Sequence, residues 1–314
     1  MPEGLGSTLH NEGMTSDRKA LTGTAFATLL LIAFMMGANH VAARFAFNNG
    51  VDVVTAVSCR SAVTALVVGL LLWQQKVSFA TTTRDKKFLL LIGGLIAVQS
   101  VCLYSSVARL PVALALLAFN TYPLSTAVWA RILYGHKAER AVLMAMPLML
   151  IGLALALDVL GAASGLGAAA HWSQIGAGIA FALAASATFG LAMVLTQHEV
   201  GGLDGRLRTF SILGLVAVFA VSAALTQGGF HLPTADAGWW GLGMLTFLYG
   251  TAFTLMLIVL PRLGVVGNSA IMNVEPVFAL VLAWALLDQA IASIQVAGAL
   301  LVVATVMWLG LRKR

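Results

Sequence analysis

The chain has 314 residues, of which 60% are hydrophobic and 10% are charged, with a mean hydropathy of +0.94. Soluble domains carry roughly 25% charged residues, so this composition excludes a soluble globular protein and predicts an all-α integral membrane protein. The net charge of +6 does not indicate nucleic-acid binding, because the basic residues are few and lie between apolar runs.

Apolar runs long enough to cross a bilayer, which takes about 20 residues, recur along the chain and predict ten transmembrane helices. The predicted spans are residues 22–45, 53–74, 87–108, 112–133, 140–160, 175–197, 207–227, 238–260, 265–287 and 291–311. Residues 1–20 predict a disordered tail, and residues 312–314 a basic C-terminus. The Gly- and Ala-rich segment 161–174 predicts a linker between two five-helix halves, residues 21–160 and 175–311.

Lysine and arginine are distributed unevenly between the two sides of this predicted membrane domain. Arg44 and Arg109 fall at outer span ends, and Arg60 lies within the second span. The other 15 of the 18 basic residues fall on the side of the N-terminus: Arg18, Lys19, Lys76, Arg84, Lys86, Lys87, Arg131, Lys137, Arg140, Arg206, Arg208, Arg262, Arg312, Lys313 and Arg314. Positive loops stay in the cytoplasm, so we expect a bacterial-type inner-membrane protein with both termini cytoplasmic.

The two predicted halves repeat one another at an offset of 153 residues. The fourth span contains Asn-Thr-Tyr-Pro at 120–123, and the ninth contains Asn-Val-Glu-Pro at 273–276. The same offset pairs Gly37 with Gly190, Arg109 with Arg262 and Val112 with Val265. Because each half has five spans, an odd number, the second half must enter the membrane from the opposite side. Inverted repeats are typical of secondary transporters, and a duplicated structural scaffold is the alternative.

These residues resemble the ten-helix, EamA-type branch of the drug/metabolite transporter superfamily. The resemblance depends on Glu275-Pro276, on Asn120 and Pro123, on Arg60 and on Gly37. It implies two EamA-type domains and the export or uptake of small molecules, and the chain looks most like bacterial aromatic amino-acid exporters. The family usually has a Gly-Glu pair after the fourth and ninth spans. Here those places read Gly135-His136 and Leu287-Asp288.

Polar groups beside the two prolines are the first candidates for substrate contact. Glu275 lies near the bilayer centre and either exchanges a proton during transport or hydrogen-bonds the backbone beside Pro276. Asn120 and Asn273 either bind the substrate or tie helices together. Four residues are candidate kinks or hinges: Gly37, Pro123, Gly190 and Pro276.

A second group of candidates lies on the first span. His40 and Arg44 share a helical face that follows Asn39. Arg44 either pairs with a substrate carboxylate or snorkels to the headgroups, and His40 either senses pH or packs against a carbonyl. Arg60 is interpreted as a structural arginine. Three tyrosines at cavity depth contact either substrate or neighbouring helices: Tyr104, Tyr122 and Tyr249.

The chain lacks several motifs that would indicate other functions. It has no G-x-x-x-x-G-K-[ST] phosphate loop, no H-E-x-x-H and no G-x-S-x-G, so neither an ATPase nor an enzyme is expected. Cys59 and Cys102 lie in spans, and we expect free thiols with no metal or cofactor.

The sequence therefore predicts a secondary transporter for aromatic or large neutral amino acids that alternates access to a cavity lined by spans 1, 3, 4, 6, 8 and 9. The alternatives are a multidrug or quaternary-amine exporter and an intramembrane lipid-modifying enzyme. Its expected partners are a small-molecule substrate, the lipid bilayer and, if Glu275 titrates, protons, with no nucleic acid. No G-x-x-x-G pair marks a dimer, so a monomer is expected.

Overall fold

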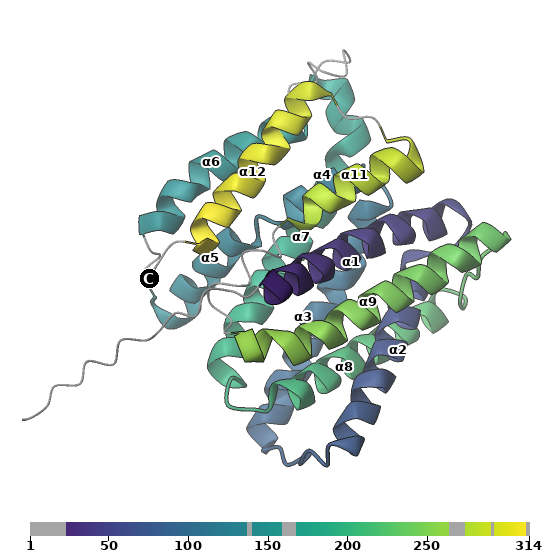
Figure 1. The fold of residues 1–314 in the computed structure, drawn as a ribbon, viewed down its shortest axis with the longest axis vertical. Helices are drawn as coiled ribbons and strands as arrows, with labels where there is room; N and C mark the ends of the chain where they lie inside the picture. The colour runs from purple at the N-terminus through teal and green to yellow at the C-terminus, as the bar shows by residue number, and fades with distance from the viewer. Residues whose placement is uncertain (1–22, 137–139, 159–167, 264–273, 290–291, 312–314) are drawn as a thin grey trace, which may run out of the picture.

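The computed structural model describes residues 23–136, 140–158, 168–263, 274–289 and 292–311, and all regular structure in these ranges is helical (Figure 1). The first half contains α1 (Gly23–Asn48), α2 (Val53–Gln74), α3 (Thr83–Val107), α4 (Val112–Phe119), α5 (Tyr122–Tyr134) and α6 (Arg140–Ala156). The second half contains α7 (Ala168–Glu199), α8 (Gly205–Thr226), α9 (Asp236–Leu263), α11 (Glu275–Leu287) and α12 (Ser293–Leu311).

The helices agree with a membrane protein in length and composition. Six described segments are long and apolar enough to cross a membrane: Phe26–Asn48, Val53–Gln74, Thr83–Val107, Val112–Tyr134, Trp172–Glu199 and Gly205–Thr226. Predictions for residues 1–20, 312–314 and the first part of 161–174 lie outside the described residues. α7 begins at Ala168, inside the predicted linker, because three consecutive alanines there favour a helix.

The fourth predicted span is two helices rather than one. α4 ends at Phe119, Asn120 caps it, and α5 begins at Tyr122. Pro123 therefore lies in the first turn of a new helix, where the missing N–H group costs no intrahelical hydrogen bond. α11 begins in the same way at Glu275, with Pro276 in its first turn. Each proline thus starts a helix near the middle of the fold.

The two halves pack against each other reciprocally. α1 packs on α9 and α11, while α7, which occupies the corresponding place in the second half, packs on α3 and α5. α2 packs on α8, and α6 packs on α12. Figure 1 shows α1 lying between α9 and α11, and α6 beside α12. Exchanging the halves leaves this pattern of helix pairs unchanged, which is how a two-fold relation between two units behaves.

Gly37 and Gly190 permit the closest contacts in this pattern. A Cβ atom on Gly37 would lie 2.9 Å from the backbone oxygen of Glu275 and 3.1 Å from the nitrogen of Ala279. A Cβ atom on Gly190 would lie 2.8 Å from the backbone nitrogen of Thr126. Residues 126 and 279 differ by the repeat offset, so each glycine seats the first helix of one half against a helix start in the other half.

The interior and the surface of the bundle are both apolar. Every residue of α4 from Val112 to Ala118 is buried, and this helix lies in the largest hydrophobic cluster. The surface carries many exposed large side chains, including Trp73, Trp240 and Trp284. Such a surface is unusual for a soluble protein and suits contact with lipid, with tryptophan at the headgroup level.

We expect Gly37→Ala and Gly190→Ala to destabilise the protein by about 1–3 kcal/mol, because backbone cannot move away from the new methyl group as a flexible side chain can. Thermal unfolding of the purified protein in detergent measures the effect. Gly214→Ala and Gly243→Ala are matched controls within helices, since a Cβ at either position meets nothing within 4 Å. Equal melting temperatures for all four variants would show that the two close contacts are not tight.

Candidate functional site

An ionisable pair joins the two halves beside the start of α11. Nε2 of His40 on α1 lies 3.2 Å from Oε1 of Glu275, and the side chains are 5% and 21% exposed. His40 is one helical turn beyond Gly37, so the close packing of Gly37 on α11 brings the pair together. The N-terminus of α11 also favours a carboxylate, since the helix dipole is positive there. Glu275 therefore lies between the imidazole of His40 and the N-terminus of α11 while part of its surface stays open.

Tyr104 of α3 is fully buried next to this pair. Its hydroxyl donates a hydrogen bond of 2.9 Å to Oδ1 of Asn39, and its ring meets His40 edge-on at 5.6 Å between centroids. Within the described residues, Nδ2 of Asn39 and Nδ1 of His40 are buried without a hydrogen-bond partner. Buried polar atoms are nearly always paired, so these two donors or acceptors are available to a ligand.

Arg60 of α2 lies on the other side of Tyr104. Its guanidinium carbon is 4.3 Å from the ring centroid of Tyr104 and 4.2 Å from that of Tyr249 on α9. All three side chains are buried. Cation–π contacts of this kind contribute about 2 kcal/mol or more when they are desolvated. Arg60 thus joins two helices of the first half to one of the second half.

Arg44 occupies a different place from the one expected of a substrate ligand. Its Nη1 atom donates to the backbone oxygen of Val107 at 2.8 Å and to that of Leu110 at 3.4 Å. The carbonyl group of Val107 belongs to the last turn of α3 and that of Leu110 follows it, at a helix end where the dipole attracts a cation. In this structure the guanidinium of Arg44 therefore stabilises a helix end.

The described candidates around the α4–α5 break make mainly local contacts. Asn120 donates through Nδ2 to the backbone oxygen of Leu116 at 2.8 Å, within its own turn. The ring of Tyr122 packs edge-on against Phe189 at 5.0 Å between centroids. Asn273 lies outside the described residues. Tyr122 thus belongs to an aromatic cluster with Phe119 and Phe189.

Contacts between the halves also close the end of the bundle where α3 begins. Glu199 at the end of α7 accepts from Arg84 at 2.6 Å and from the hydroxyl of Tyr134 at 2.5 Å. The Tyr134 ring stacks on His198 at 4.0 Å. We call Arg84, Tyr134, His198 and Glu199 the inner cluster. In the loop before α8, hydrogen bonds from the guanidinium of Arg206 lower the pKa of Asp204 to about 2.

A second set of contacts between the halves closes the opposite end. Oδ2 of Asp52 lies 3.3 Å from Nδ1 of His231. The backbone nitrogen of Thr234 donates to the oxygen of Asn49 at 3.1 Å. Each of these contacts joins the first half to the second, so the described structure is held together at both ends.

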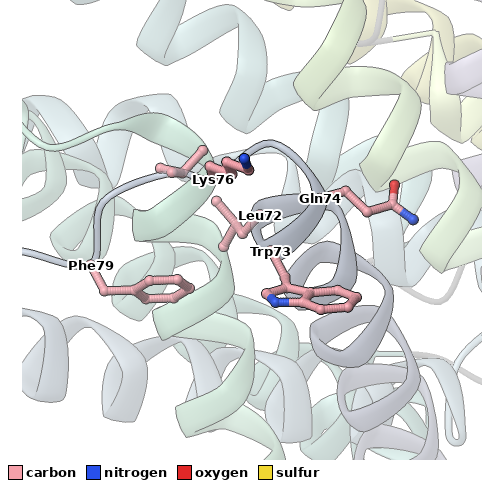
Figure 2. Close-up of a pocket in the computed structure, with 6 residues that line it drawn as sticks. Leu72, Trp73, Gln74, Lys76 and Phe79 are labelled. Carbon is pink, nitrogen blue, oxygen red and sulfur yellow. The ribbon is translucent and has the colours of Figure 1, made fainter.

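The clearest cavities lie away from these polar groups. An open groove of about 550 Å³ lies at the end of α2 and is lined by Leu72, Trp73, Gln74, Lys76, Val77 and Phe79. Figure 2 shows the side chains of this groove. A second, apolar groove of about 420 Å³ lies between α3 and α8 and includes Leu90, Val98 and Phe219. No group of three or more metal-binding side chains occurs among the described residues. Neither groove offers the paired charges found around Tyr104.

Two features of the site were missed by reasoning from the sequence alone. The sequence predicts a structural Arg60 but not its partners, because its contacts with Tyr104 and Tyr249 join residues 44 and 189 positions apart along the chain. The pairing of His40 with Glu275 was likewise not predicted, although both residues were candidates. A possible signal was the rarity of ionisable groups within spans, since such groups need partners at the same depth.

Comparison with known proteins places this arrangement in context. The family model described as the EamA-like transporter family matches residues 23–157 and again 176–311. No match is found among curated proteins. A protein of known crystal structure aligns with 94% of this chain and 100% of its own, with a TM-score of 0.60 and 16% identity. At that identity the likeness concerns the fold alone.

We expect Tyr104→Phe to destabilise the protein by about 1–3 kcal/mol, because Asn39 would lose the partner of a buried carbonyl oxygen. The ring over Arg60 would remain. Tyr249→Phe is the matched control on the same guanidinium, with no hydrogen bond to Asn39 to lose. Thermal unfolding in detergent compares the two, and a larger loss for Tyr249→Phe would contradict the assigned role of the Asn39 bond.

Proposed function

Because this chain belongs to the EamA-like transporter family, we propose that it is a secondary transporter that exports or exchanges aromatic or large neutral amino acids by alternating access. It is a multi-pass membrane protein with a small-molecule substrate, and members of its family are transporters rather than enzymes. The substrate class, the direction and the mechanism are parts of the proposal.

The pair of His40 and Glu275 is the observation that carries the proposal. It brings an acid and an imidazole from different halves to 3.2 Å inside a predominantly apolar helical bundle. Ionisable residues at such depth are costly and usually serve an ion or substrate pathway. When the halves separate locally, the pair opens and the carboxylate becomes available to a substrate ammonium group or to a proton.

Two inverted five-helix repeats, in a ten-helix protein, form the framework of the proposed cycle. The reciprocal helix pairs and the equivalent contacts of Gly37 and Gly190 support this arrangement. The equivalent helices α3 and α9 also begin at opposite ends of the bundle, which supports the inversion. α3 begins near Glu199 of the inner cluster, whereas α9 begins near Asn49 at the other end. In such transporters the substrate lies between the repeats, and rocking of one repeat against the other exposes it to each side in turn.

Gates at both ends are required by this cycle. The inner cluster supplies one, because Glu199 joins α7 to α3 and α5 across the halves. The contacts of Asp52 with His231 and of Thr234 with Asn49 supply the other. Breaking one set while the other holds would open the bundle on a single side.

The chemistry of the polar groups favours amino acids as substrates. A cation, Arg60, and an anion, Glu275, lie on either side of the rings of Tyr104 and His40. A zwitterion with an aromatic or large apolar side chain complements such a lining. A drug or quaternary-amine exporter needs only Glu275, and it remains the second candidate because this carboxylate is partly open.

The setting in the cell completes the proposal. The bias of basic residues supports an inner membrane with both termini cytoplasmic, so the inner cluster would face the cytoplasm. We propose that the monomer is the working unit, because both gates and the ionisable pair lie within one chain. Protons are a partner to the extent that Glu275 and His40 exchange them.

We expect proteoliposomes containing the purified protein to take up labelled phenylalanine or tryptophan above empty liposomes. In Glu275→Gln the shape of the pair is kept and its charge removed, so we expect uptake to continue without its response to an imposed proton gradient. Asp288→Asn, a carboxylate change at the other end of α11, is the control. Uptake of drug cations alone, lost in Glu275→Gln, would instead establish the second candidate.

We expect Glu199→Ala to open the inner end, because it removes the acceptor shared by Arg84 and Tyr134. The population of the state that is open at the inner end should rise about 2–10-fold, which corresponds to the loss of about 0.5–1.5 kcal/mol for a hydrogen-bonded contact. The labelling rate of a cysteine placed at buried Ala192, in a chain whose native cysteines are replaced, measures it. Asp85→Asn is the control, since its hydrogen bonds with Thr82 lie within one half. Unchanged labelling would exclude the inner cluster as a gate.

A further inference from the structure

We infer that Arg60, between the rings of Tyr104 and Tyr249, binds the carboxylate of the transported solute. This inference rests on the proposed function and names the group by which the substrate is recognised. The starting observation is that Arg60 is 4% exposed while carrying a full charge. A buried cation is costly unless it is paired, so its neighbours must be accounted for.

The side chains around Arg60 cover its faces. The guanidinium carbon lies 4.3 Å from the ring centroid of Tyr104 and 4.2 Å from that of Tyr249. Among the described residues, these two rings do not form an aromatic pair with each other. The guanidinium therefore lies between them. Aromatic rings stabilise a cation but accept few in-plane hydrogen bonds. Nε at the edge of the group is buried without a hydrogen-bond partner among the described residues, and a planar guanidinium binds a carboxylate through two parallel bonds.

No ion pair among the described residues supplies a counter-charge to Arg60. In the described residues the ion pairs are Glu275 with His40, Glu199 with Arg84, Asp204 with Arg206 and Asp52 with His231. None of them includes Arg60. The undescribed segment 264–273, between α9 and α11, contains no Asp or Glu. The described part of the chain thus gives Arg60 no carboxylate partner, and the carboxylate of the solute would supply its counter-charge.

Unused donors lie beside the same ring. Nε of Arg60 and Nδ2 of Asn39 are both buried and without a hydrogen-bond partner in the described part of the chain. Asn39 is oriented by Tyr104, whose hydroxyl holds its Oδ1 atom and leaves its amide hydrogens available. A carboxylate bound at Arg60 would satisfy donors that otherwise remain orphaned in an apolar interior.

The ordinary alternative is a purely structural arginine that ties α2 to α3 and α9. Such a residue would affect folding but not the choice of substrate. The two roles differ in one measurable respect, which is discrimination between a solute and its analogue without the carboxylate charge.

The test compares uptake of labelled L-phenylalanine and L-phenylalaninamide by wild-type protein in proteoliposomes. We expect the amide, which lacks the charge, to be transported at least about 100-fold less efficiently, because a site built for a charged partner rejects a ligand that leaves its donors unpaired. In Arg60→Lys, which keeps the charge but loses the fork, we expect the KM for phenylalanine to rise about tenfold with little change in turnover. Arg60→Met should remove the discrimination altogether.

The outcomes separate this inference from the proposed function. Equal transport of the amino acid and its amide by wild-type protein would overturn the carboxylate site and leave amino-acid transport standing. Transport of no amino acid, together with Arg60-dependent uptake of phenylpyruvate, would preserve the carboxylate site and reject the amino-acid substrate. Transport of neither anion class would reject both. An unchanged KM in Arg60→Lys would also overturn the site, and the wild-type comparison does not depend on any variant folding.

Discussion

The close contact of Gly37 with the first turn of α11 is the constraint on which the site depends. It brings two helix backbones together in a place where a side chain of any size would keep them apart. One turn further along α1, His40 consequently reaches Glu275. A buried helix start also needs its free backbone groups shielded from lipid, and this packing provides the shield. The same contact therefore sets both the architecture of the interior and its only described acid–imidazole pair at depth.

The helices follow from the sequence because their causes are local. Long apolar runs with short polar breaks determine where a membrane helix begins and ends, and the repeat offset of 153 residues gives α5 and α11 equivalent bounds. The partners of polar side chains have no such local cause. Arg44 and Arg60 are both arginines in apolar segments of the first half. Arg44 binds carbonyl groups at the end of α3, whereas Arg60 lies between two tyrosine rings. These different contacts depend on which distant helices pack together, and the local sequence does not specify that packing.

The two-fold relation of the helices does not extend to the chemistry. At the repeat offset, Asn39, His40, Arg60 and Tyr104 correspond to Ala192, Met193, Leu213 and Leu257. The first half thus carries polar groups where the second half carries apolar ones, while both halves keep their glycine contacts. Packing of backbones constrains both copies equally, whereas a single solute needs only one set of ligands. Duplication therefore accounts for the repeated helix packing, and divergence of the side chains accounts for polar residues that occur in the first half alone.

The reciprocal pairing of the helices has a consequence for biogenesis. α1, α2 and α3 find their main partners in α9, α8 and α7, which are synthesised later. The first half therefore enters the bilayer with Arg60 and His40 still lacking the tyrosine ring and the carboxylate supplied by the second half. Nascent chains in this state carry uncompensated polar groups in hydrocarbon and depend on the insertion machinery or water to shelter them. Completion of the chain, rather than of either half, is the event that fixes the native membrane domain.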